Sequence, residues 1–154
     1  MASYRLMLWA FAAGALIPVM AVLNARMGRS LHTPLHAPVI LFVVALTACL
    51  VGAWLLTQRL PQAQDLRGIR PVELIGGLIV VFYVTSATLL APQIGVANFI
   101  FLAVTAQIFS SLAIDHFGLF GAMQRPVSVS KLIGAGLLLA GLVLTQIADN
   151  NSSR

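Results

Sequence analysis

The chain alternates between long uncharged, apolar stretches and short polar segments. The first such stretch has 20 residues between Arg5 and Arg26, the length at which an α-helix crosses about 30 Å of hydrocarbon. Four further crossings follow, and strand-like alternation of apolar and polar residues is absent. We therefore predict an all-α, polytopic integral membrane protein with five transmembrane helices, at about residues 6–25, 38–56, 74–91, 96–114 and 132–148.

Prolines and glycines set two of the predicted boundaries. Pro34 makes the start of the second stretch a poor helix, so we expect that helix to begin near Pro38, with this proline in its first turn. Residues 74–114 carry no formal charge. This stretch is too long for one crossing and is suited to two. We predict a turn between them at Pro92–Gly95, because proline and glycine both favour a chain reversal there.

The connections between the predicted helices are short. The longest, residues 57–72, is polar and contains Pro61 and Pro71, which leaves no room for a second domain. The first helix is not expected to be a cleaved signal peptide, since no convincing small-residue cleavage site precedes Asn24 and four more spans follow. We expect residues 1–154 to form a single five-helix transmembrane domain.

The composition excludes a water-soluble domain. The chain is 60% hydrophobic and 8% charged, with a mean hydropathy of +0.98, whereas soluble domains are about 25% charged. The net charge of +5 comes from basic residues that are scattered singly, without interleaved aromatic residues, so no nucleic-acid partner is expected. The lone Cys49 allows no disulfide within the chain.

The basic residues give a weak preference for one orientation. With five crossings the termini lie on opposite sides, and the side of the N-terminus carries six basic residues against three on the other. The positive-inside rule therefore favours a cytoplasmic N-terminus. The six are Arg5, Arg59, Arg67, Arg70, Arg125 and Lys131, and the three are Arg26, Arg29 and Arg154. A chain balanced in this way is compatible with insertion in both directions.

Polar residues within the third and fourth helices are candidates for a substrate path, because an unpaired polar group in lipid is costly. Tyr83 lies at the middle of the third helix and shares a face with Ser86. The alternative to a binding role is that its hydroxyl bonds a neighbouring backbone carbonyl. On the fourth helix Asn98 and Thr105 share one stripe, and Gln107 projects from nearly the opposite side. We favour the face of Gln107 for a cavity, because its amide has the larger hydrogen-bonding capacity.

Two further candidates lie at helix ends. Asn24 closes the first helix, and Asp115 ends the fourth as the only acid near a span end that can reach the membrane core. The predicted substrate-binding residues are thus Asn24, Tyr83, Ser86, Gln107 and Asp115.

Several chemistries are disfavoured. No Asp or Glu lies at the centre of a span, which argues against cation exchange through a central carboxylate. His32 and His36 are separated by Pro34 and lack a third ligand, so no metal site is expected. No set of residues resembles a catalytic constellation, and we expect neither an enzyme activity nor a cofactor.

Three runs of residues resemble a known family: Pro18–Gly28, Gly76–Gly95 and Gln107–Pro126. They are similar to the YdcZ-type family of the drug/metabolite transporter superfamily, whose distant relatives are the small multidrug resistance proteins. The most specific pieces are Asn24 with Arg26, the Tyr83–Thr85 step before Ala91 and Pro92, and Asp115–Gly118.

The resemblance implies a multi-pass protein of the bacterial inner membrane that acts as a five-helix half-transporter. Family members occur singly, as adjacent pairs and as fused ten-helix chains, which points to two antiparallel copies forming one unit. The first helix lacks the central glutamate of the small multidrug resistance proteins, so their proton-antiport mechanism is not carried over.

The leading hypothesis is a secondary transporter of a small organic solute. A five-helix bundle has little interior, so we expect an antiparallel dimer, with an identical copy or an oppositely oriented homologue, that shares a cavity near the bilayer midplane. The alternatives are a passive channel built from the same polar residues and a non-transporting membrane scaffold.

Overall fold

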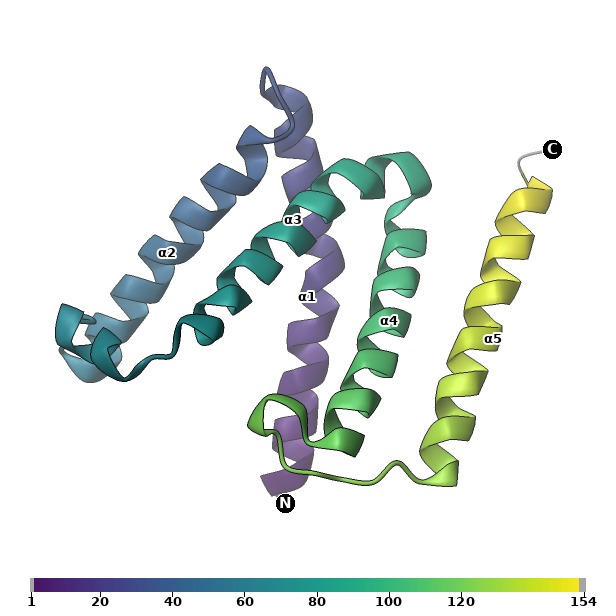
Figure 1. The fold of residues 1–154 in the computed structure, drawn as a ribbon. Coiled ribbons are helices and arrows are strands. Elements are labelled where there is room, and N and C mark those ends of the chain that lie inside the picture. Colours follow the sequence, from purple (N-terminus) through teal and green to yellow (C-terminus); the bar gives the residue numbers. More distant parts are fainter. Residues whose placement is uncertain (1, 153–154) are drawn as a thin grey trace. The chain divides into compact units, whose positions relative to one another are not determined.

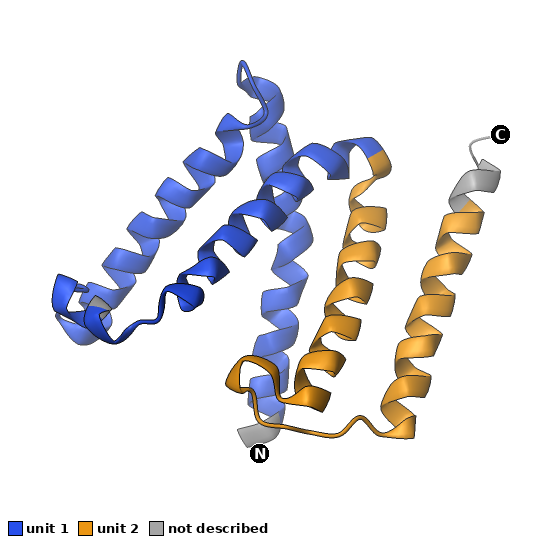
Figure 2. Cartoon of the chain, in the orientation of Figure 1, with its two compact units in different colours: residues 1–93 blue, residues 94–154 orange. Residues whose placement is uncertain are grey.

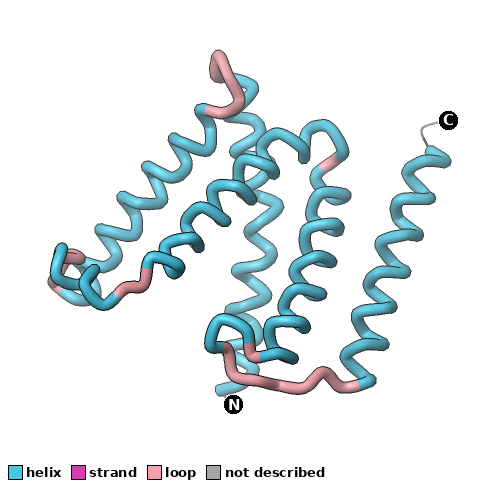
Figure 3. Tube along the Cα trace, in the orientation of Figure 1, coloured by secondary structure: helices cyan, strands magenta, loops and turns pink. Residues whose placement is uncertain are grey.

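Residues 2–152 are described in a computed structural model and form helices joined by short connections (Figure 1). The long helices are α1 (Ala2–Ser30), α2 (His36–Thr57), α3 (Ile75–Ile94), α4 (Val96–Phe117) and α5 (Val129–Ser152). Three short 3₁₀ helices, η1 (Ala63–Gly68), η2 (Pro71–Leu74) and η3 (Leu119–Gly121), lie in the connections. No strand occurs in the described range (Figure 3), and each long helix is long and apolar enough to cross a membrane, which confirms the five-helix prediction.

The helices extend beyond the predicted spans. Helix α1 continues past Ala25 to Ser30, and α5 begins at Val129 rather than at residue 132. The predicted limits were set by charged residues, yet Arg and Lys are good helix formers whose long side chains reach the interface from a helix end. The start of α2 agrees with the prediction, because Pro38 is its third residue. Arg154, which enters the charge comparison, lies outside the described residues.

The predicted turn at Pro92–Gly95 is wrong in its extent. Helix α3 continues through Pro92 to Ile94, and Gly95 alone separates it from α4. Side chains satisfy two of the carbonyls at this helix end: Gln93 Nε2 donates to the Leu89 carbonyl at 2.7 Å, and Asn98 Nδ2 donates to the Ile94 carbonyl at 2.9 Å. These bonds stabilise the last turns beyond Pro92, whereas the carbonyl that loses its backbone donor to the proline is that of Thr88.

The chain divides into two compact units, residues 1–93 and residues 94–154 (Figure 2). In the first unit α1 packs against α2, and a side-chain hydrogen bond joins α1 to α3. In the second unit α4 packs against α5 and against η3. The single transmembrane domain that the sequence predicts stays a prediction.

Small residues form the buried faces of the first unit. Buried positions on α1 and on α3 follow the same spacing of i, i+3, i+4 and i+7, which marks one stripe of a helix. They are Ala21, Asn24, Ala25 and Gly28 on α1, and Val84, Ala87, Thr88 and Ala91 on α3. Narrow stripes of this kind allow helix backbones to approach closely where lipid supplies no hydrophobic driving force.

Gly28 is a position of close backbone approach in this packing. A Cβ atom on Gly28 would lie 3.5 Å from Cγ2 of Thr88 and 3.4 Å from Cα of Pro34. The α1 backbone therefore contacts both α3 and the loop before α2 at this residue.

The conformation of Gly95 gives a test of the observed turn. Its φ of 89° and ψ of 141° strain any residue with a side chain, at a cost of about 1–3 kcal/mol. We expect Gly95→Ala to lower the midpoint of thermal unfolding in detergent, followed by circular dichroism. Gly52→Ala in α2, where a Cβ meets nothing within 4 Å, is the matched control and should unfold at or above the native midpoint. Equal midpoints for the two variants would contradict the observed turn.

Candidate functional site

Asn24 and Thr88 are the buried polar residues of the described chain, with exposed fractions of 2% and 3%. The Nδ2 atom of Asn24 donates a hydrogen bond to Oγ1 of Thr88. The Thr88 hydroxyl in turn donates to the Val84 carbonyl of its own helix at 2.8 Å. Because that hydroxyl has one proton, its oxygen must accept from Asn24, and this fixes which end of the amide faces α3.

The other end of the Asn24 amide has no partner. Its Oδ1 atom is buried and accepts no hydrogen bond from the described residues. Leaving a buried acceptor unpaired costs about 1–3 kcal/mol, so each such atom in a folded protein calls for an explanation, such as a bound water, ion or ligand.

Asn24 also lines a groove between α1 and α2 with a volume of about 370 Å³. Every other side chain that lines this groove is apolar: Leu16, Val19, Met20, Leu23, Met27, Ile40, Leu41 and Val44. An apolar groove with a single polar side chain is suited to an apolar molecule that carries one polar group.

The two candidates on α3 lie apart from this groove. Tyr83 and Ser86 are both half-buried on α3, and neither lines the groove between α1 and α2. Ser86 borders a separate concavity on α3 together with Thr85. A shared role for Asn24, Tyr83 and Ser86 in binding therefore stays a prediction.

In the second unit the two polar faces of α4 have different surroundings. Asn98 Oδ1 accepts a hydrogen bond of 3.1 Å from Nε2 of Gln146 on α5. Thr105, on the same stripe, lines a groove of about 260 Å³ between α4 and α5. Gln107 is exposed, so the face of Asn98 and Thr105 is the one that bonds a neighbouring helix. A cavity at Gln107 stays a prediction.

Asp115 lies in the last turn of α4, where the backbone is tied to the following loop. Its carbonyl accepts a 2.7 Å hydrogen bond from the amide of Arg125. Next to it, the His116 carbonyl accepts from Gln124 Nε2 at 3.1 Å, and His116 Nδ1 accepts from the amide of Val127 at 3.2 Å. These bonds give the Asp115–His116 pair a structural role that the sequence reasoning did not identify, and a binding role for Asp115 stays a prediction.

Sequence reasoning also missed Thr88 as the partner of Asn24, Gly28 as a neighbour of Thr88, and Gln146 as the partner of Asn98. The signal for the first two was present in the shared spacing of small residues on α1 and α3. Gln146 carried no comparable signal, since its partner Asn98 is 48 residues away in the sequence.

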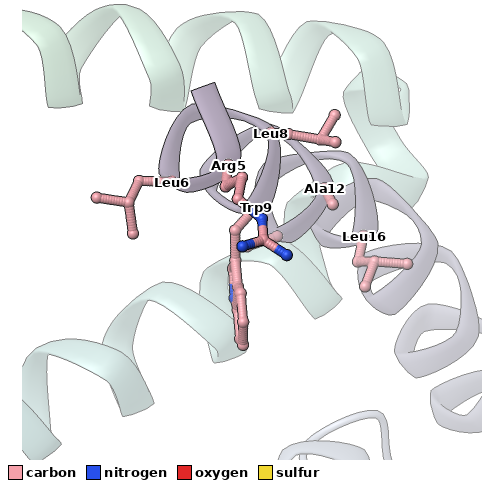
Figure 4. A pocket seen from close by; sticks show the side chains of 7 residues that line it. Arg5, Leu6, Leu8, Trp9, Ala12 and Leu16 are labelled. Atoms are coloured by element: carbon pink, nitrogen blue, oxygen red, sulfur yellow. The ribbon is translucent and has the colours of Figure 1, made fainter. Parts of the chain in front are cut away.

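A further concavity, of about 840 Å³, lies along one face of α1 (Figure 4). All of its lining residues belong to this single helix, so it is an open surface rather than a cavity. Arg5 and Trp9 both line this face, four residues apart on the helix (Figure 4). Indole and guanidinium groups are typical of the headgroup level of a bilayer, so this face is suited to contact lipid.

A family model described as "Putative inner membrane exporter, YdcZ" matches residues 5–144. No curated protein and no solved structure matches the chain. The match covers most of the sequence, and the chain belongs to the YdcZ family of inner membrane exporters. It is thus a multi-pass inner membrane protein of a transporter family, as the resemblance implied.

The bond between Asn24 and Thr88 gives a direct test of the site. Thr88→Val keeps the shape of the side chain but leaves Nδ2 of Asn24 without its acceptor. We expect it to lower the free energy of unfolding in mixed micelles by about 1 kcal/mol.

Thr47→Val is the matched control, because the Thr47 hydroxyl donates only to the Val43 carbonyl of its own helix, at 2.9 Å. This variant should change the stability by no more than a few tenths of a kcal/mol. Equal losses in the two variants would show that the bond to Asn24 contributes nothing.

Proposed function

We propose that the chain is one half of a secondary transporter that exports a small organic solute. Two copies in opposite orientations, or one copy with an oppositely oriented homologue, form the transport unit. The solute binds near the bilayer midplane, and one copy rocks against the other to expose the site to each side in turn. The observation that carries this proposal is the match to the exporter family over residues 5–144.

The scarcity of buried surface supports a second copy. In the most apolar 18 residues of each candidate span, the fraction of residues that is buried ranges from 0% in α2 to 22% in the span Pro71–Ile94, which comprises η2 and α3. The grooves found on the described chain are open and border one or two helices each. A transport site needs walls on all sides, and a partner would supply those that one chain lacks.

The balance of basic residues supports opposite orientations. Arg26 and Arg29 lie at the end of α1 that the charge count of the whole chain would place outside, and they oppose the preference set by the other loops. A chain with competing signals of this kind is suited to insert both ways.

Topology is the first test of the dimer. We expect a C-terminal green fluorescent protein and a C-terminal alkaline phosphatase to be active on the same chain, because each reports one orientation. Replacing both Arg26 and Arg29 by Ala should move the C-terminus outside and favour the phosphatase. Lys131→Arg keeps the charge and is the control, with no change expected. A C-terminus found on one side only would refute the antiparallel homodimer.

Gln107 gives a test of transport. We expect Gln107→Ala to abolish the protection that expression of the protein gives cells against an exported solute, found by screening growth against a panel of apolar amines. The amount of protein in the membrane should stay unchanged, because Gln107 is exposed. Gln64→Ala, in the loop helix η1, is the control and should keep full protection. Protection that survives the loss of Gln107 would remove this residue from the solute path.

A further inference from the structure

The unpaired Oδ1 atom of Asn24 is a buried hydrogen-bond acceptor that the described contacts leave unexplained. The residue is 2% exposed, and its Nδ2 atom is already engaged by Thr88. The Thr88 hydroxyl donates its proton to the Val84 carbonyl, so its oxygen can only accept from Asn24. If the Asn24 amide were rotated by half a turn, its Oδ1 atom would face the Thr88 oxygen, and two acceptors would lie against each other. The position and the polarity of the free end are therefore fixed by α3.

We propose that Asn24 Oδ1 accepts a hydrogen bond from the exported solute, and that the solute is an amphipathic molecule with an N–H or O–H donor on an apolar body. A primary alkylamine or an alcohol has this chemistry. The inference rests on the proposed export function and gives its substrate class.

The groove beside Asn24 sets the rest of this specificity. Its lining contains no charged side chain, so the amide oxygen is the one polar group there that can compensate a solute. An anionic oxygen would face this acceptor, and a quaternary ammonium ion has no proton to donate to it, whereas an N–H or O–H donor forms a hydrogen bond with it. The lone amide oxygen therefore selects for donors among molecules with the same apolar body.

Two flexible side chains flank the acceptor within the groove. Met20 lies one turn before Asn24 on α1, and Met27 lies three residues after it. Methionine adapts its shape to different neighbours, which suits a site that accepts apolar bodies of varied shape. Specificity then resides in the one polar contact.

The acceptor is covered in this structure. Asn24 is one of the residues that line the groove, whereas its Oδ1 atom is buried, so a solute reaches Oδ1 only after the side chains that cover it have moved. In this proposal the structure corresponds to a closed form of the site, and a bound donor would favour an open form by supplying the missing hydrogen bond.

Nuclear magnetic resonance of the asparagine side chains tests the proposal. The sequence contains four asparagines, so protein labelled with ¹³C- and ¹⁵N-asparagine in lipid nanodiscs gives few signals, and Asn24→Asp identifies that of Asn24. The probes are hexylammonium and hexan-1-ol, with hexyltrimethylammonium as the tail-matched control without a donor. We expect the two donors to shift the Asn24 signal saturably, with an apparent affinity roughly tenfold above that of the control.

The Asn98 signal is an internal control for effects of the probes on the bilayer. Its Oδ1 atom already accepts from Gln146, so it should not move. Equal shifts of the Asn24 signal with donors and with the quaternary ion, or no saturable shift with either donor, would overturn the proposal.

Variants of Thr88 test how the acceptor is fixed. Thr88→Ser keeps the hydroxyl and should keep the preference for donors, whereas Thr88→Val frees the amide to turn and should remove most of it. Equal preference in both variants would overturn the assigned role of Thr88.

These binding results are independent of transport. A donor-selective Asn24 signal in a chain that inserts in one orientation supports the acceptor site and refutes the antiparallel homodimer. Dual insertion without a donor-selective signal keeps the transporter and refutes the acceptor site.

Discussion

A polar side chain in hydrocarbon must find its partner within the protein, and in residues 1–93 that requirement is met by the hydrogen bond from Asn24 to Thr88. Lipid offers no hydrophobic force that draws helices together, so close backbone approach and shared hydrogen bonds have to hold them. The stripe of small residues around Asn24 and the stripe around Thr88 provide the close approach, and the bond fixes one helix against the other. The orientation of the amide and its unpaired oxygen both follow from this contact.

In the second unit the side chain of Asn98 also finds its hydrogen-bond partners within the protein. Asn98 uses both ends of its amide, one on the Ile94 carbonyl and one on Gln146 of α5. No acceptor is left over there, and this asparagine has the pattern expected of a packing residue. The Oδ1 atom of Asn24, in contrast, has no hydrogen-bond partner among the described residues. This difference distinguishes Asn98, a structural amide, from Asn24, a candidate binding residue.

The number and order of the helices could be predicted from the sequence because uncharged stretches of membrane-spanning length are a strong signal. The ends of the helices could not be predicted in this way. Arg26, Arg29 and Lys131 lie inside helices, whereas the prediction placed the helix ends at charged residues. Pro92 misled the prediction for a related reason: side-chain bonds from Gln93 and Asn98 to terminal carbonyls depend on neighbours that a rule about proline does not consider.

For the candidate site, the sequence identified Asn24 by its polarity at a helix end, and the structure adds Thr88 as the residue that orients it. Pairing between α1 and α3 is a long-range contact, and one sequence indicates only which faces are narrow, not which faces meet. Tyr83, Ser86, Gln107 and Asp115 were chosen by the same criterion of polarity within a span. A binding role for these four residues stays a prediction.

The proline inside α3 has a mechanical consequence. Its nitrogen carries no hydrogen, so the backbone bond that residue 92 would give to the Thr88 carbonyl is missing, and the helix is least stiff at that turn. Thr88, whose side chain binds Asn24, is thus the residue whose carbonyl lacks this bond. A bend of α3 at this turn would displace the Thr88 hydroxyl relative to Asn24, so the flexibility of the helix and the hydrogen bond between the two side chains are linked.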